Sequence, residues 1–205
     1  MSGALLSARG LRVDYDGRTV ARLDALDVAA GEAVAIIGPN GSGKSTLLRV
    51  LALLERPTAG TVTVCGRELG ARGEDAPRRD VTLALPQPWL FTGTVLGNVE
   101  RGLAARGLRR AGRRRRALTS LDALGVAALA PRDARRLSSG ESARVALART
   151  LVQETRVLLL DEPFAHLDPD DLPAAVAAVR ARQAAGAAVV LAVLACGGSD
   201  PSTPT

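Results

Sequence analysis

The stretch Gly38-Pro39-Asn40-Gly41-Ser42-Gly43-Lys44-Ser45 decides the fold of this chain. It matches the pattern G-x-x-x-x-G-K-[ST] at every defined position. An apolar run, Val34–Ile37, precedes it and predicts a buried strand, and Thr46–Leu51 follows it at helical spacing. Strand, glycine loop and helix in this order are the context that the pattern requires. The alternative, a glycine-rich turn that binds nothing, is disfavoured because all three parts agree.

The residue types in this stretch suit a chain of phosphates. Glycines let the backbone curl so that several N–H groups point into one concavity, and the N-terminus of the following helix adds partial positive charge. We expect Lys44 to reach the β- and γ-phosphates of a nucleotide and Ser45 to offer its hydroxyl to Mg²⁺. The predicted nucleotide-binding residues here are Gly38, Pro39, Asn40, Gly41, Ser42, Gly43, Lys44, Ser45 and Thr46.

A second stretch pairs an apolar strand with two acids. Val157–Leu160 is wholly apolar and is followed by Asp161 and Glu162. Buried strands of parallel sheets have this pattern, and ligands of such sheets gather at the carboxyl ends of the strands. Asp161 is predicted to hold Mg²⁺ through water, and Glu162 to act as general base toward an attacking water. A surface turn is the alternative, and the complete glycine loop upstream favours the functional interpretation.

Composition limits the class of protein. The 205 residues suggest one domain, with room for an inserted lobe. Hydrophobic residues make up 47% and aromatic residues only 2%, so the core must consist of Ala, Val and Leu. The net charge of +6 is concentrated in the run Arg109–Arg116, which we interpret as a solvated helix face. No aromatic residues interrupt this run, so we expect no nucleic-acid partner.

Cysteines and hydropathy indicate a cytoplasmic protein. Cys65 and Cys196 form no metal or redox motif and are interpreted as reduced thiols. The N-terminal residues lack the pattern of a signal peptide. The longest apolar run, Ala184–Cys196, is too short to span a bilayer, so any membrane role must come through a partner.

Alternation of apolar residues, helical spacing and turn signals place the remaining elements. The first two strands should form an antiparallel layer, and the arginine-rich helices a separate lobe. The predicted elements are strands at 4–15, 19–28, 61–65, 81–85 and 188–194, an exposed loop at 67–79, helices within 94–129 and at 170–183, and a disordered tail at 197–205.

Three further positions have two interpretations each by pattern alone. Tyr15, the only tyrosine, ends a predicted strand and is either a surface for stacking a nucleotide base or a core or edge residue. Gln87 lies between two prolines, which fix an extended loop and present its amide, but a lone glutamine is also ordinary surface. Ser138 and Glu141 have the spacing of a helix capping box, which by itself implies no ligand.

Taken together, these stretches resemble the ATP-binding-cassette (ABC) family, in particular the nucleotide-binding subunit of a bacterial importer. The likeness covers residues 5 to about 194, and its specific part is Leu137–Glu141 followed by Arg144–Arg149, which is similar to the family signature. The resemblance implies an α/β fold: a P-loop NTPase core with a mainly parallel sheet and an antiparallel β layer at the N-terminus. It also implies a single domain over 1–196, with an α-helical lobe inserted at about 94–137.

The resemblance assigns roles to single residues. It implies that Tyr15 stacks on adenine, and that Gln87 senses Mg²⁺ and the attacking water while facing a membrane partner. It also implies that Asp161 is the carboxylate that binds the metal, that Glu162 is the catalytic base, and that Asp168 contacts a partner subunit. The residues expected to bind the ATP held by a second copy are Ser138, Ser139, Gly140 and Glu141. The catalytic set is Glu162, Gln87 and Lys44, and the metal set is Ser45, Gln87 and Asp161.

Family likeness also implies partners and location. We expect a homodimer whose two copies face head to tail around two Mg-ATP molecules, seated on a transmembrane permease at the inner face of the membrane. A solute-binding protein would be an indirect partner. Tungstate, molybdate or sulfate is a candidate solute by general likeness, and amino acids are the alternative.

The sequence departs from the family pattern at three positions. Ser139 replaces a glycine of the signature, and Glu141 replaces a glutamine. Leu194 stands near the position where the family has a histidine that holds the γ-phosphate, and the family's final strands and helix do not follow. His166 is not expected to substitute for that histidine. Two alternatives to a hydrolysing importer subunit therefore stay open: a nucleotide-binding module with weak or no hydrolysis, and an ABC ATPase outside transport.

Overall fold

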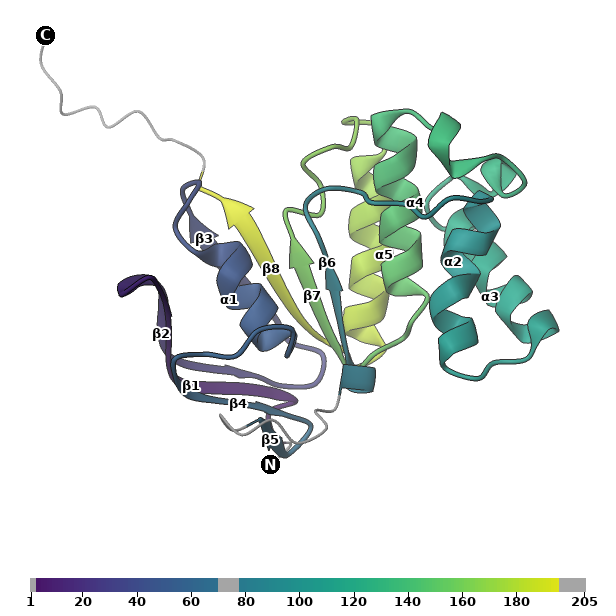
Figure 1. The fold of residues 1–205 in the computed structure, drawn as a ribbon. Coiled ribbons are helices and arrows are strands. Elements are labelled where there is room, and N and C mark those ends of the chain that lie inside the picture. The colour runs from purple at the N-terminus through teal and green to yellow at the C-terminus, as the bar shows by residue number, and fades with distance from the viewer. Residues whose placement is uncertain (1–2, 70–77, 196–205) are drawn as a thin grey trace, which may run out of the picture.

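The computed structural model describes residues 3–69 and 78–195, which fold into two sheets and a set of helices (Figure 1). The predicted tail at 197–205 and most of the predicted loop at 67–79 lie outside the described residues. One sheet is antiparallel, in the order β2-β1-β4-β5, and the other is parallel, in the order β3-β8-β7-β6. The strands are β1 Leu6–Tyr15, β2 Arg18–Val28, β3 Ala33–Gly38, β4 Ala59–Val64, β5 Arg67–Leu69, β6 Val81–Ala84, β7 Val157–Asp161 and β8 Ala188–Leu194.

The helices divide between the two faces of the parallel sheet. α1 follows the glycine loop and lies on the side of the antiparallel sheet, and the other α-helices lie on the opposite side (Figure 1). The α-helices are α1 Lys44–Leu51, α2 Val95–Ala105, α3 Arg110–Asp122, α4 Ser139–Leu151 and α5 Leu172–Ala184. Short 3₁₀ helices lie at Arg78–Asp80, Ala127–Leu129 and Ala134–Arg136. None of the helices in the described part of the chain has the length and apolar character to cross a membrane.

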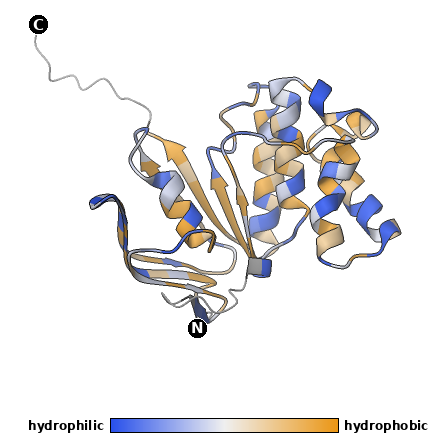
Figure 2. Ribbon diagram, in the orientation of Figure 1, coloured by the Kyte–Doolittle hydropathy of each residue, from blue (hydrophilic) through white to orange (hydrophobic). Residues whose placement is uncertain are grey.

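β7 shows how one strand joins two cores. Its side chains alternate between the faces of the sheet, as the pleat requires. Val157 and Leu159 pack in the core shared with α1 and the antiparallel sheet, whereas Leu158 and Leu160 pack against the helices of the other side. All five residues of the strand are buried, so the strand has no polar face and reads as a continuous apolar run. Figure 2 shows β7 and β8 coloured as hydrophobic between the two layers.

The predicted fold class is confirmed, and two local predictions are wrong. The run Val34–Ile37 does form a strand, but one face of it is exposed, and Ile37 is 67% exposed. β3 is the edge strand of the parallel sheet and pairs only with β8 among the described residues. Val34 and Ile36 pack against the core on one face, whereas Ala35 and Ile37 on the other face belong to neither core of the described residues. Residues 67–69 form a strand rather than a loop, because Cys65 and Gly66 take φ of 51° and 78° and close a two-residue hairpin.

Candidate active site

The glycine loop joins the carboxyl end of β3 to the N-terminus of α1. Gly41 and Gly43 have φ of 76° and 85°, a region that glycine enters without steric cost. Gly43 is the N-cap of α1 and supplies no side-chain acceptor, and the first turn of the helix carries no acid. The first N–H groups of α1 are therefore left for an anion from outside the chain.

Lys44 is the buried cation of this loop. Its side chain is 7% exposed, and Nζ donates at 2.8 Å to the carbonyl oxygens of Gly38 and Pro39. Within the described residues no carboxylate lies within ion-pair distance of Nζ. A buried charge with only neutral acceptors is electrostatically incomplete, and phosphate oxygens would complete it.

Asp161, the last residue of β7, and Glu162, which follows it, have different surroundings. Asp161 is 2% exposed, and its Oδ1 is buried with no hydrogen-bond partner among the described residues. An unpaired buried carboxylate oxygen fits the ligand type that Mg²⁺ prefers. Glu162 has φ of 47°, donates its N–H to the Ala192 carbonyl at 3.0 Å, and is only half-buried. The left-handed turn therefore separates a buried acid from one that faces outward.

Strand order brings the acids close to the glycine loop. β8 lies between β3 and β7, so the carboxyl ends of β3 and β7 are two strand spacings, about 10 Å, apart. The register pairs Gly38 with Leu194 and Asp161 with Ala192 along the same edge. The loop with Lys44 and the acids Asp161 and Glu162 thus share one edge of the sheet, as predicted for parallel strands.

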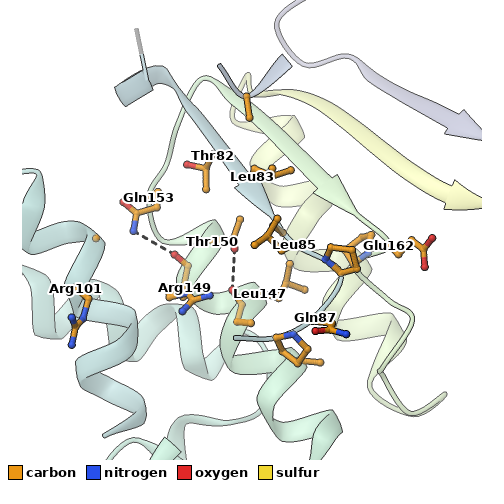
Figure 3. A pocket seen from close by; sticks show the side chains of 18 of the residues that line it. Thr82, Leu83, Leu85, Gln87, Arg101, Leu147, Arg149, Thr150, Gln153 and Glu162 are labelled. Carbon is orange, nitrogen blue, oxygen red and sulfur yellow. Dashed lines mark hydrogen bonds between the residues drawn. The ribbon is translucent and has the colours of Figure 1, made fainter. Parts of the chain in front are cut away.

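Gln87 and Glu162 line one cavity of about 510 Å³ between the end of β6 and the helices α2 and α4. Figure 3 shows these two side chains on the same side of the cavity, with Arg101 and Gln153 on the other. Phe91 also lines the cavity, and its ring centroid lies 4.4 Å from the Arg101 guanidinium and 5.5 Å from that of Arg149. Burial lowers the pKa of Arg149. His166 also lines this cavity, and it stays a prediction that this residue does not substitute for the family's histidine.

The predicted capping box is present at the start of α4. The Ser138 hydroxyl accepts from the Glu141 N–H at 3.2 Å, and the Glu141 carboxylate accepts from the Ser138 N–H at 2.8 Å. This backbone hydrogen bond is the main cause that lowers the pKa of Glu141. A side chain at Gly140 would place a Cβ 3.3 Å from Oδ2 of Asp168, so the loop after β7 packs closely here.

The signature and the glycine loop are not brought together within one chain. α1 and α4 lie on opposite sides of β6 and β7 (Figure 1). Their N-termini are therefore separate features of this chain's surface.

Tyr15 lies at the end of β1, where it is 43% exposed and its hydroxyl donates to the Glu55 carboxylate. Glu55 also accepts from Arg49 Nε at 3.1 Å, and Arg49 Nη2 donates to the Thr46 hydroxyl at 3.0 Å. Sequence reasoning missed Glu55 and Arg49. They belong to no motif, and because α1 ends between them, helical spacing does not reveal the pair.

Comparison with known proteins agrees with this geometry. The family model described as "ABC transporter" matches residues 23–165. The phosphate import ATP-binding protein PstB 2 of Natronomonas pharaonis is 39% identical over 207 residues, covering 93% of this chain and 73% of that protein. The Fe(3+) ions import ATP-binding protein FbpC of Streptomyces coelicolor is 43% identical over 169 residues, covering 82% of this chain. The chain spans about half, 48%, of the length of FbpC.

Solved structures show the same fold. The dimeric cassette MJ0796, described as a bacterial ABC transporter cassette, has a TM-score of 0.84 at 28% identity and covers 92% of this chain and 87% of that one. The same cassette in a post-hydrolysis state bound to ADP and Pi has a TM-score of 0.83. The chain therefore belongs to the ABC transporter family, as one of its ATP-hydrolysing cassettes.

Proposed function

We propose that this chain powers solute import by hydrolysing Mg-ATP against a separate membrane subunit. One observation carries the proposal: an uncapped helix N-terminus, a buried ammonium and a buried unpaired carboxylate share one edge of the parallel sheet. Each lacks a partner that Mg-ATP would supply. The triphosphate would complete α1 and Lys44, and the cation would complete Asp161.

We assign different roles in the reaction to the residues at this edge. The loop N–H groups and Lys44 would bind the β- and γ-phosphates, and Ser45, Asp161 and Gln87 would hold Mg²⁺. When bound, Mg²⁺ neutralises the charge that develops on the phosphates. Glu162 is half-buried and lines the same cavity as Gln87, where its carboxylate can accept a proton from the attacking water.

A second copy would complete the site. The signature residues Ser138, Ser139, Gly140 and Glu141 lie at the N-terminus of α4, away from the glycine loop of their own chain. A head-to-tail dimer would place them over the γ-phosphate of the other copy, where small residues and the helix dipole suit close approach. The dimeric structure of the similar cassette MJ0796 supports this arrangement.

The membrane subunit would dock beside the cavity. Trp89 and Phe91 are 71% and 50% exposed next to it, and exposed aromatic side chains of this kind mark interaction surfaces. Docking there would place the chain peripherally on the inner face of the membrane, with a solute-binding protein as an indirect partner. We propose an oxyanion as the solute, because the relative PstB 2 is named for phosphate import. A metal ion, named for FbpC, is the second candidate.

Phosphate release by the purified chain with Mg-ATP tests the catalytic proposal. Glu162→Gln keeps the shape of the side chain but removes the base, so we expect the rate to fall about 10²- to 10⁴-fold. Glu68→Gln, on an exposed acid of β5, is the matched control and should leave the rate unchanged. Equal low rates from the parent chain and Glu162→Gln would instead support a nucleotide-binding module.

A further inference from the structure

Tyr15 lies at the tip of the β1–β2 hairpin. The backbone of this tip is held by contacts of neighbouring residues, and the Tyr15 side chain takes no part in them. Asp14 donates its N–H to the Thr58 hydroxyl at 2.9 Å, and its carboxylate accepts from the Thr19 hydroxyl at 2.8 Å. Arg12 pairs with Asp14 at 3.0 Å. These contacts fix the hairpin, but none of them fixes the direction of the tyrosine ring.

Glu55 holds the tyrosine ring by its hydroxyl. One oxygen of this carboxylate accepts from the Tyr15 hydroxyl, and the other accepts from Arg49 Nε at 3.1 Å. The Glu55 side chain is 23% exposed, so water competes weakly for these contacts. Burial alone would lower the pKa of Arg49, but its interactions with Glu55 and Tyr15 outweigh this effect and raise the pKa.

The same carboxylate connects the ring to the glycine loop. Arg49 Nη2 donates to the hydroxyl of Thr46, which is 6% exposed and lies in the first turn of α1, two residues after Lys44. Tyr15, Glu55, Arg49 and Thr46 therefore form one continuous line of side chains. It runs from the hairpin tip to the helix that receives the phosphates.

We propose that Glu55 is a positioning residue for nucleotide binding: it holds the Tyr15 ring in place as the platform for the base and ties that platform to α1 through Arg49. The inference rests on the proposed function, in which Tyr15 stacks on the base. Stacking depends on the orientation of the ring, and a ring ordered before binding does not lose rotamer freedom when the base arrives. Glu55 itself does not touch the nucleotide.

The test compares two ligands, Mg-ATP and Mg-tripolyphosphate, which lacks base and sugar. Glu55→Ala should weaken Mg-ATP about 3- to 10-fold and leave tripolyphosphate within about twofold, as part of a stacking contribution of 1–3 kcal/mol. Tyr15→Ala should weaken Mg-ATP about 5- to 150-fold with the same selectivity. The double variant should bind no more weakly than Tyr15→Ala alone, because both changes remove one unit.

Two further variants sharpen the result. Glu55→Gln keeps an oxygen that can accept from the tyrosine hydroxyl, so it should recover most of the affinity for Mg-ATP. Glu68→Gln, on an exposed acid outside the network, should match the parent chain. Isothermal titration of each variant with both ligands gives the comparison.

Three outcomes would overturn the inference. Equal losses for both ligands in Glu55→Ala would mean that Glu55 only supports the fold. Unchanged Mg-ATP affinity in Glu55→Ala, with a loss in Tyr15→Ala, would mean that the ring needs no positioning. Unchanged affinity in Tyr15→Ala would remove the base platform itself, whereas failure of the proposed phosphate site would appear separately, as undiminished binding of both ligands by Lys44→Ala.

Discussion

Gly43 is constrained twice, by its backbone angle and by its neighbour. Its φ is 85°, and a Cβ would lie 2.3 Å from the carbonyl oxygen of Val20 in β2. Gly41 has a similar φ of 76°, but a Cβ there would meet nothing within 4 Å. A comparison of the two glycines therefore distinguishes the cost of a left-handed backbone from the cost of a clash with the neighbouring strand.

The prediction at this scale compares Gly43→Ala with Gly41→Ala. Each change places a side chain in the left-handed region, at about 1–2 kcal/mol. Gly43→Ala must also displace β2, so it should lower the free energy of unfolding further and weaken Mg-ATP binding more. Denaturant titration and nucleotide titration of both variants measure this. Equal losses in the two variants would show that the contact with Val20 does not constrain the loop.

At the scale of elements, α4 begins with a cap that depends on pH. The Ser138 N–H, donated to the Glu141 carboxylate, lowers the pKa of Glu141 below its usual value of 4.5. Because the pKa is lower in the folded chain than in the unfolded one, the ionised carboxylate stabilises the fold above about pH 4.5. That stabilisation is lost as the pH falls through the folded pKa.

The lowered pKa of Glu141 leads to a prediction about stability. Glu141→Gln keeps an oxygen acceptor but has no charge, so its melting temperature should lie below that of the parent chain at pH 7. The difference should shrink as the pH falls below 4.5. Thermal unfolding of both chains across this range checks it. A difference that is the same at pH 7 and pH 3.5 would contradict the role assigned to the ionised cap.

Elements buried on both faces were the easiest to predict. β8 has the bounds that its apolar run indicated, and β7 ends at its two acids. β3 has a similar apolar run but lies at a sheet edge, and composition does not reveal which strand is at the edge. β5 has only three residues, too few for a periodic pattern.

The candidate site likewise contains residues that the sequence predicted and residues that it did not. The glycine loop and the acids Asp161 and Glu162 are local motifs, so the sequence alone predicted their place at one sheet edge. Glu55 is forty residues from Tyr15 in the chain, and their contact depends on how the hairpin lies against the end of α1. Contacts of this kind come from tertiary packing and have no sequence pattern.

At the scale of the whole molecule, the sheet holds two binding surfaces apart. The glycine loop lies on the side of α1 and the signature on the side of α4, with β6 and β7 between them (Figure 1). A single chain therefore offers only half of the contacts expected around the γ-phosphate. Nucleotide should act as the link between two copies, since each copy supplies what the other lacks.

This arrangement predicts dimerisation that depends on nucleotide. Glu162→Gln should keep ATP bound by slowing hydrolysis, and with Mg-ATP it should form a dimer that neither ADP nor nucleotide-free conditions produce. Ser139→Arg, which places a bulky cation at the signature, should abolish the dimer without weakening binding of Mg-ATP to the monomer. Light scattering after size exclusion measures both. A chain that stays monomeric at saturating Mg-ATP would contradict the head-to-tail arrangement.

The central claim is that a buried ammonium and uncapped amides bind a triphosphate, and Lys44→Ala tests it most directly. Replacing this lysine removes a charge-assisted contact worth about 1.5–3 kcal/mol, so the account predicts Mg-ATP affinity about 10- to 150-fold weaker by calorimetric titration. Lys44→Arg should not restore it, because a guanidinium fork does not replace a compact ammonium. Undiminished Mg-ATP affinity in folded Lys44→Ala would contradict the account.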